Sequence, residues 1–184
     1  GRGVEMKRRV AMGHVAHLGF GEPQLQLLEV TDQAQGGWAG IGSGEELDRF
    51  LETFFPHPVR FRQAWAQLGG AAGPAAKALH VWKPIPPSED FISLGVCCTT
   101  TDAEPPASAM RCVPKRWARR LAEKEVAPLW TDRGTGGAPA RFWARRRQAA
   151  ALFEVAAGAA ASAPPEVFAM ADAEKFFVAL PPET

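Results

Sequence analysis

The chain has 184 residues, of which 46% are apolar and 22% are charged, so it can bury a sizeable core and is not a disordered chain. Its 21 basic and 20 acidic residues give a net charge of +1, which argues against a dedicated nucleic-acid-binding protein unless the charges are segregated. No secretory signal pattern is present, and the most apolar window, residues 150–165, is interrupted by Glu154 and ends in two prolines. We therefore predict no transmembrane helix. Because the first residue is Gly1 and not Met, we expect a fragment of a longer protein.

The cysteines and histidines do not form a recognisable metal or disulfide pattern. Cys97 and Cys98 are adjacent and Cys112 stands apart, so no C-x2-C spacing exists, and adjacent residues on a strand point to opposite faces. This pattern favours buried, inert thiols over a metal site or a catalytic cysteine, and it fits a reducing, cytoplasmic compartment. We expect no cofactor and no bound metal.

In chain order, the first predicted elements are a strand and a helix. Alternation of apolar residues in QLQLLEV predicts a strand over 25–30. A helix is predicted over 43–55, because Ser43 and Glu46 have capping-box spacing and Pro56 ends the segment. Its apolar face consists of Leu47, Phe50, Leu51 and Phe54. Most of the remainder is short β-type runs broken by Gly and Pro, which predicts a mainly β fold, a sandwich or prism-like body with the helix at one end.

An internal repeat organises the rest of the chain. The corresponding positions are Trp65 with Trp130, Trp82 with Trp143, residues 91–94 with 152–155, and the double proline 105–106 with 164–165. We predict two tandem β units, about 61–118 and 127–178. Residues 1–60 lie outside this repeat and are expected to finish a preceding unit or to form a small separate module.

Two phrases of the repeat carry a family resemblance: LWTDRGTGGAPARFWA (129–144) and VWKPIPPSEDFISLGV (81–96). Together they resemble the repeat of the vacuolar-protein-sorting-62-related proteins and of the adaptor-binding region of the vacuolar protein sorting 13 lipid-transfer family. That repeat reads Trp-x-Asp-x-Gly-Ser-Gly, then Phe-Trp-x-Pro, then Pro-x-Gly-Tyr-x-x-Leu-Gly. The matching positions here are Trp130, Asp132, Gly134, Gly136, Trp82, Pro84, Pro87, Leu94 and Gly95.

The resemblance implies a β-rich repeat, no enzymatic chemistry, and attachment to large proteins that work at membranes. We therefore expect a non-catalytic interaction module of a larger membrane-trafficking or lipid-transfer protein. Its expected partners are an adaptor peptide, an anionic membrane surface, or both, so a peripheral membrane location is the alternative to a purely cytoplasmic one.

The candidate peptide-binding residues are Trp82, Pro84, Pro86 and Pro87. A stiff aromatic corner of this kind can receive an extended or polyproline-type peptide. The alternative is that the tryptophans, including Trp65 and Trp143, are core anchors that stack within their own unit.

Three basic clusters are candidates for contact with an anionic surface: 7–9, 115–120, and Arg141 with 145–147. Trp117 and Trp143 are interleaved with the last two. Such a composition suits anionic lipid headgroups, with nucleic acid less favoured. A solvated face whose side-chain stems cover aromatic rings is the alternative. The candidate contacts are Lys115, Arg116, Arg145, Arg146 and Arg147.

The glycine-rich segment TDRGTGG (131–137) is predicted to be a hairpin loop. A phosphate-binding loop needs Gly-Lys-Ser/Thr at the start of a helix, whereas Pro139 and an aromatic strand follow here. Asp132 is expected to accept backbone N–H bonds, with Gly134 and Gly136 at positive φ. Asp132 together with the arginine clusters leaves a second function open, a lectin-like or phosphoinositide-binding domain.

Overall fold

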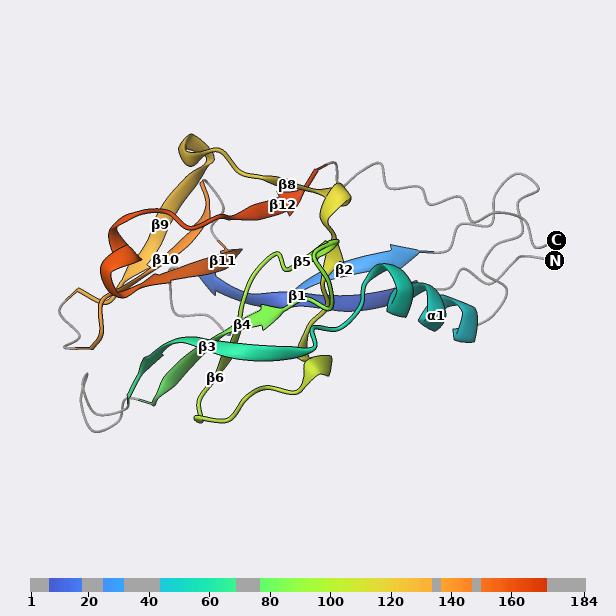
Figure 1. The fold of residues 1–184 in the computed structure, drawn as a ribbon, viewed down its shortest axis with the longest axis horizontal. Coiled ribbons are helices and arrows are strands. Elements are labelled where there is room, and N and C mark those ends of the chain that lie inside the picture. The colour runs from blue at the N-terminus through green and yellow to red at the C-terminus, as the bar shows by residue number, and fades with distance from the viewer. Residues whose placement is uncertain are drawn as a thin grey trace.

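The computed structural model describes residues 7–17, 25–31, 44–68, 77–133, 137–146 and 150–171. Within these ranges the protein is mainly β with one α-helix, which confirms the predicted fold class (Figure 1). The first strands and the helix are β1 Lys7–His17, β2 Leu25–Thr31, α1 Gly44–Phe54, β3 Arg60–Gln67, β4 Leu79–Ile85, β5 Phe91–Ile92 and β6 Cys97–Thr99. The later strands are β7 Val113–Pro114, β8 Ala118–Arg120, β9 Val126–Thr131, β10 Ala140–Arg145, β11 Ala150–Ala157 and β12 Phe168–Met170. Short 3-10 turns are η1 Ala107–Ala109, η2 Lys115–Trp117, η3 Glu123–Glu125 and η4 Gly158–Ser162.

The strands form one large sheet and three small ones, with antiparallel pairing throughout the described pairs. The five-stranded sheet has the order β2-β1-β11-β10-β9, and the three-stranded sheet has the order β3-β4-β6. β8 pairs with β12, and β5 with β7. The structure thus places the N-terminal hairpin, β1 and β2, in the same sheet as the predicted second unit.

Sequence reasoning found β2 but missed β1, because β1 departs from simple alternation. Val10 and Met12 are buried, but Gly13 has a φ of 134° and the pairing with β2 shifts between Ala11 and His14. A Cβ at Gly13 would lie 3.0 Å from the carbonyl oxygen of Val96, so this position requires glycine. The bulge lets His14 N–H donate to that same carbonyl at 2.9 Å.

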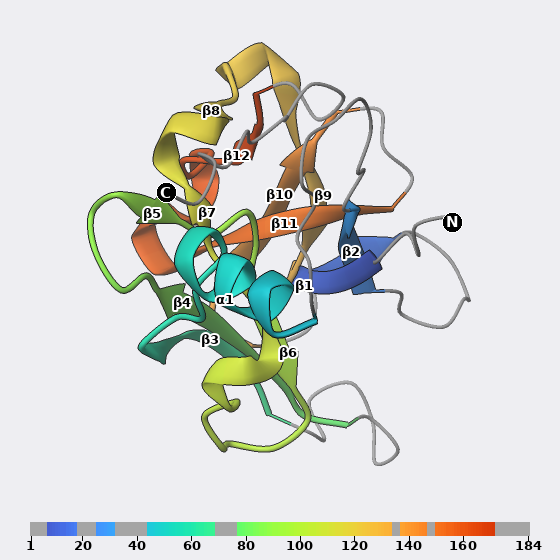
Figure 2. The ribbon, with the colours of Figure 1, turned by 90° about the vertical axis from the view of Figure 1, so that its right-hand side faces the viewer.

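The predicted helix is confirmed as α1, at one end of the molecule (Figures 1 and 2). Leu47 and Leu51 are buried, and Phe54 stacks on Trp117 with ring centroids 5.7 Å apart. Ser43, the predicted cap, lies outside the described residues. In the ranges that the structure describes, no helix is long and apolar enough to cross a membrane.

The first two strands of one predicted unit correspond to the first two strands of the other, but the third strands do not correspond as the sequence predicts. β3–β4 and β9–β10 are both antiparallel pairs with an irregularity beside a repeat tryptophan; Trp65 lies opposite Val81, and Trp130 opposite Phe142. The sequence register then fails. Residues 91–92 form β5 and pair with β7, and the third strand of the first unit is β6 instead. Its counterpart in the second unit is β11.

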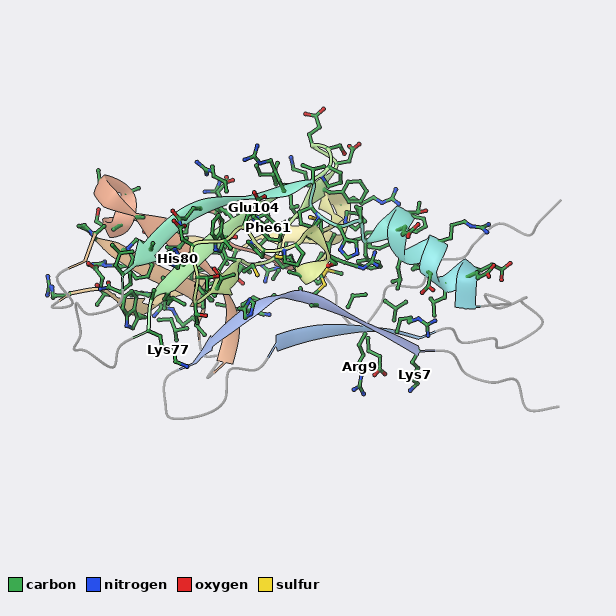
Figure 3. The ribbon with its side chains drawn as sticks, turned by 90° about the horizontal axis from the view of Figure 1, so that it is seen from below. Lys7, Arg9, Phe61, Lys77, His80 and Glu104 are labelled. Carbon is green, nitrogen blue, oxygen red and sulfur yellow. The ribbon has the colours of Figure 1, made fainter. Side chains whose placement is uncertain are left out.

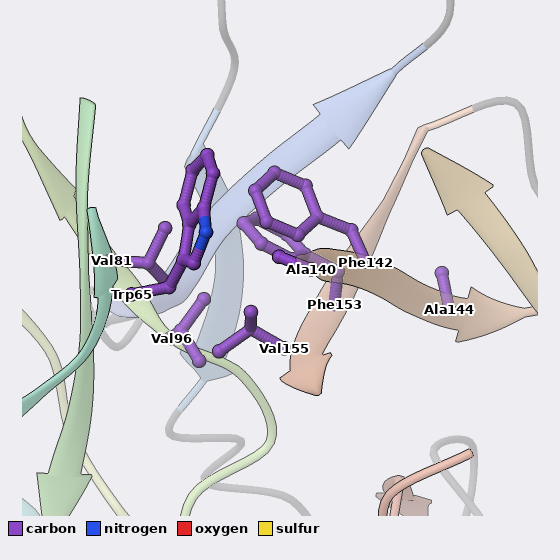
Figure 4. Close-up of a cluster of buried hydrophobic side chains, with 8 residues drawn as sticks. All are labelled: Trp65, Val81, Val96, Ala140, Phe142, Ala144, Phe153 and Val155. Atoms are coloured by element: carbon purple, nitrogen blue, oxygen red, sulfur yellow. The ribbon is translucent and has the colours of Figure 1, made fainter. Parts of the chain in front are cut away.

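The main core lies between the three-stranded and five-stranded sheets (Figure 4). Trp65 and Val81 come from the first unit and meet aromatic rings of the second, with Trp65 perpendicular to Phe142 at 5.7 Å between centroids. The Trp65 indole N–H donates to the Ala138 carbonyl at 2.8 Å, so its polar atom is satisfied where it is buried. The repeat tryptophan of the first unit is therefore a core anchor.

Candidate functional site

Trp82 belongs to a second core cluster on the other face of the three-stranded sheet. It is 7% exposed and packs with Phe61, Cys97 and Met110, and its indole N–H donates to Thr99 Oγ1 at 2.7 Å. Pro84 is also buried. The peptide-contact prediction is thereby corrected for both residues, because a side chain covered by its own core offers no surface to a partner.

The exposed remainder of this segment forms an apolar corner with a residue from the neighbouring strand. Pro87 is exposed and Pro86 is half-buried, while Ile85 is 36% and Val59 60% exposed. The Val59 N–H donates to the Ile85 carbonyl at 2.9 Å, so these two apolar residues are held side by side. We call Val59, Ile85, Pro86 and Pro87 the proline corner. Sequence reasoning missed Val59, because its neighbour in space is 26 positions away in the chain.

The N-terminal basic cluster is paired with acids. Lys7 and Arg9 lie 3.6 Å and 3.2 Å from carboxylate oxygens of Glu29, and Arg8 lies 3.2 Å from Asp48. Hydrogen bonding to Arg9, with the charge of Lys7, lowers the pKa of Glu29. Figure 3 shows Lys7 and Arg9 projecting from the side of the β1–β2 hairpin that faces away from β3. This cluster fits the solvated-face alternative.

Part of the second cluster is also paired. Arg119 makes two 2.8 Å bonds to the carboxylate of Glu125, and Arg120 lies 2.8 Å from Glu166. The bidentate contact with Arg119, together with the Ala122 N–H, lowers the pKa of Glu125 to about 2.

In the third cluster, Arg146 is occupied by backbone carbonyls. Its guanidinium donates to the carbonyl of Lys124 at 3.0 Å and to that of Val126 at 3.1 Å. These bonds fasten the end of β10 to η3, so Arg146 acts as a structural clamp and not as a free cation. Arg147 lies outside the described residues.

Four of the remaining exposed cations lie on η2, on η3 and at the end of β10. Within the described residues these four form no salt bridge, and neither do Arg60 and Arg62 on β3; Arg145 acts at longer range on Glu125. β8 joins η2 to η3 along the upper margin in Figure 1. We call the following set the basic strip: Lys115, Arg116, Lys124 and Arg145.

An aromatic ring accompanies the basic strip at its η2 end. Trp117 is half-buried, and the Arg116 guanidinium lies 5.6 Å from the centroid of its ring. The Trp117 ring also stacks on Phe54, the last residue of α1. A tryptophan held this way has one part in the core and one part at the surface.

The hairpin prediction for residues 131–137 is confirmed at Asp132. One of its carboxylate oxygens accepts the Ala140 N–H at 2.8 Å, and its own N–H donates to the Ala140 carbonyl at 3.2 Å. Gly134 and Gly136 lie outside the described residues. Of the other repeat tryptophans, Trp130 is half-buried and Trp143 is buried, and no acceptor for the Trp143 indole N–H lies within reach in the described chain.

Burial raises the pKa of all three cysteine thiols, so their reactivity is expected to be low. Cys97 and Cys112 are buried and Cys98 is half-buried, and burial raises the pKa of Cys98 and of Cys112 to about 12. The neutral thiol therefore dominates, as expected for inert cysteines. Among the residues that the structure describes, no group of three His, Cys, Asp or Glu side chains could hold a metal ion.

An ion pair between half-buried Lys83 and buried Glu154 links the two predicted units. Lys83 Nζ on β4 lies 3.1 Å from Glu154 Oε2 on β11, and Glu154 is 4% exposed. The contact lacks hydrogen-bond geometry at that oxygen. Burial raises the pKa of Glu154, and the charge of Lys83 opposes the rise.

Comparisons with known proteins do not assign the chain to a family. No family model matches it, and no curated protein matches it. The crystal structure of GNIP1Aa from Chromobacterium piscinae is similar to it with 17% sequence identity and a TM-score of 0.45. The match covers 83% of this chain and 32% of the GNIP1Aa chain. That likeness is too distant to carry an argument about function, so the sorting-family resemblance stays a prediction.

Proposed function

We propose that the chain is a non-catalytic interaction module of a larger membrane-trafficking or lipid-transfer protein, and that the basic strip contacts anionic membrane. The observation that carries the proposal is that four exposed cations without a salt bridge to a described residue lie on η2, on η3 and at the end of β10, with half-buried Trp117 beside Arg116. A basic side chain near an anionic leaflet contributes about 1 kcal/mol, so several together give measurable binding. The resemblance of Trp130 and Asp132 to the sorting repeats supports the same kind of role.

The test is flotation of the purified chain with phosphatidylcholine vesicles that contain or lack phosphatidylserine. We expect flotation only with phosphatidylserine, weakening as salt screens the charges. Arg145→Glu should reduce the floated fraction, whereas Arg60→Glu, an exposed arginine on β3, is the matched control and should not. Absence of flotation at low salt would remove the membrane contact from the proposal.

A second candidate contact is a peptide on the proline corner, in keeping with the expected adaptor peptide. The specific observation is that Val59 and Ile85 are exposed side by side beside Pro87, where a strand end would ordinarily carry polar residues. Exposed apolar residues next to prolines suit an extended, proline-containing segment, which already has its bound conformation.

This contact is tested by fluorescence anisotropy with a labelled proline-rich peptide. Ile85→Asp should weaken binding, while Leu68→Asp is the matched control, since Leu68 is 69% exposed at the opposite end of β3. Equal binding by the two variants would show that the proline corner is not the contact.

A further inference from the structure

A cavity lies between the two units, and its lining includes no residue of the basic strip or of the proline corner. Its volume is about 320 Å³, at the lower end of the range of small-molecule sites. The β3–β4 hairpin supplies its charged side, and β11 with η4 and the following prolines supplies an apolar wall. The residues that matter here are Arg62, Lys83, Ala156, Ala160, Pro164 and Pro165.

On the charged side of the cavity, two positively charged residues lie directly opposite each other on neighbouring strands. Arg62 and Lys83 are cross-strand partners in the β3–β4 ladder, so their side chains share one face. Like charges placed directly opposite each other destabilise a sheet unless an anion lies nearby.

The buried carboxylate of Glu154 neutralises only one of these charges. Glu154 pairs with Lys83 at 3.1 Å, whereas Arg62 forms no salt bridge in the described chain. The cavity therefore keeps an excess positive charge, and its carrier is a guanidinium, which holds carboxylates by two parallel hydrogen bonds.

We propose that this cavity binds a small organic carboxylate with a short apolar body. Arg62 holds the carboxylate, with Lys83 adding attraction at the same end. The body lies against the wall that Ala156, Ala160 and Pro164 form, where apolar atoms replace water. This site is independent of the proposed membrane and peptide contacts.

The test uses ligand-observed saturation-transfer NMR on the intact chain with three probes. Benzoate carries both features, benzamide is its neutral counterpart, and acetate has the charge without the body. We expect the order benzoate, then acetate, then benzamide. Loss of a charge-assisted hydrogen bond in Arg62→Gln should weaken benzoate roughly tenfold. Arg60→Gln on the same strand, which does not line the cavity, should leave the affinity unchanged within about twofold.

A second pair of variants tests the apolar wall. Ala160→Phe should fill the cavity and abolish benzoate binding, while Ala159→Phe is the control, since Ala159 is exposed on the same turn but does not line the cavity. Thermal unfolding of each variant shows that it is folded. Equal affinity of Arg62→Gln and Arg60→Gln, equal binding of benzoate and benzamide, or no saturable benzoate binding would each overturn the proposal. Inorganic phosphate binding as tightly as benzoate would also overturn it, because attraction of any anion would then suffice.

Discussion

Trp65 and Trp130 occupy equivalent positions in the two predicted units and contact each other edge to face, with ring centroids 5.6 Å apart and an interplanar angle of 64°. Trp65 also contacts Phe142, so one ring of the first unit reaches two rings of the second. Aromatic pairs of this geometry contribute about 0.5–1.5 kcal/mol to stability beyond the contribution of the apolar area that they bury. The first tryptophans of the two predicted units are therefore in direct contact with each other.

Trp65→Ala should lower the free energy of unfolding by about 3–5 kcal/mol, because it leaves a cavity between the sheets. Trp65→Phe keeps most of the volume but leaves the Ala138 carbonyl without its 2.8 Å donor, which should cost roughly 1 kcal/mol. Urea unfolding followed by circular dichroism measures both changes. Leu68→Ala, at a 69% exposed position on the same segment, should change stability by less than about 0.5 kcal/mol. A Trp65→Ala variant as stable as Leu68→Ala would refute this role.

Trp82 and Pro87 should behave oppositely although only four residues separate them. Trp82→Ala removes a 7% exposed ring and leaves Thr99 Oγ1 without its donor, so we expect a loss of about 3–5 kcal/mol. Pro87→Ala at an exposed position should cost less than about 1 kcal/mol. Thermal unfolding distinguishes them, and a Trp82→Ala variant with unchanged unfolding would restore Trp82 as a surface residue.

Glu154 should make the protein less stable as the pH rises above the ordinary carboxyl pKa of 4.5. Burial raises its pKa in the folded state, so the folded chain binds this proton more tightly than the unfolded chain. Linkage then requires that the free energy of unfolding decreases as the pH rises from 4.5 to the raised pKa. Below pH 4.5 the carboxyl is protonated in both states, so its burial does not lower the free energy of unfolding there.

Urea unfolding of the wild type and of Glu154→Gln across this pH range measures the effect. The stability of the variant relative to the wild type should increase as the pH rises, because glutamine does not titrate. Glu89→Gln, at an exposed site, is the control and should show no such trend. A stability difference between wild type and Glu154→Gln that does not vary with pH would contradict the prediction.

The thiols should react slowly in the folded protein. With the pKa of Cys98 raised to about 12, little thiolate is present, and we expect its reaction with Ellman's reagent to be at least roughly tenfold slower than that of a free cysteine. Three thiols should become reactive after unfolding in urea. Rapid labelling of one thiol under native conditions, identified by mass spectrometry, would show an accessible cysteine instead.

Local patterns predicted the elements whose signals are local. The helix over 44–54 follows from its apolar spacing and the proline after it, and β2 follows from alternation. β1 could not be predicted in the same way. Its bulge at Gly13 packs against the carbonyl of Val96, which is more than eighty residues away in the chain.

The candidate site was predictable in composition but not in geometry. The sequence shows that Trp82 stands among prolines, but the residues that bury it, Phe61 and Met110, come from distant segments. The basic clusters look alike in the sequence, and only the fold brings Glu29 to Arg9 and Glu166 to Arg120. Long-range pairing therefore decides which cations remain for a partner.

The most direct test of the membrane proposal is vesicle flotation of Lys115→Glu/Arg116→Glu beside Arg60→Glu/Lys77→Glu. Both variants reverse one lysine and one arginine at exposed positions, and only the first pair belongs to the basic strip. We predict that the first variant loses phosphatidylserine-dependent flotation by roughly tenfold or more, since each cation contributes about 1 kcal/mol near an anionic surface. The second variant should float like the wild type. Equal flotation of the two variants would contradict the proposal that the basic strip contacts the membrane.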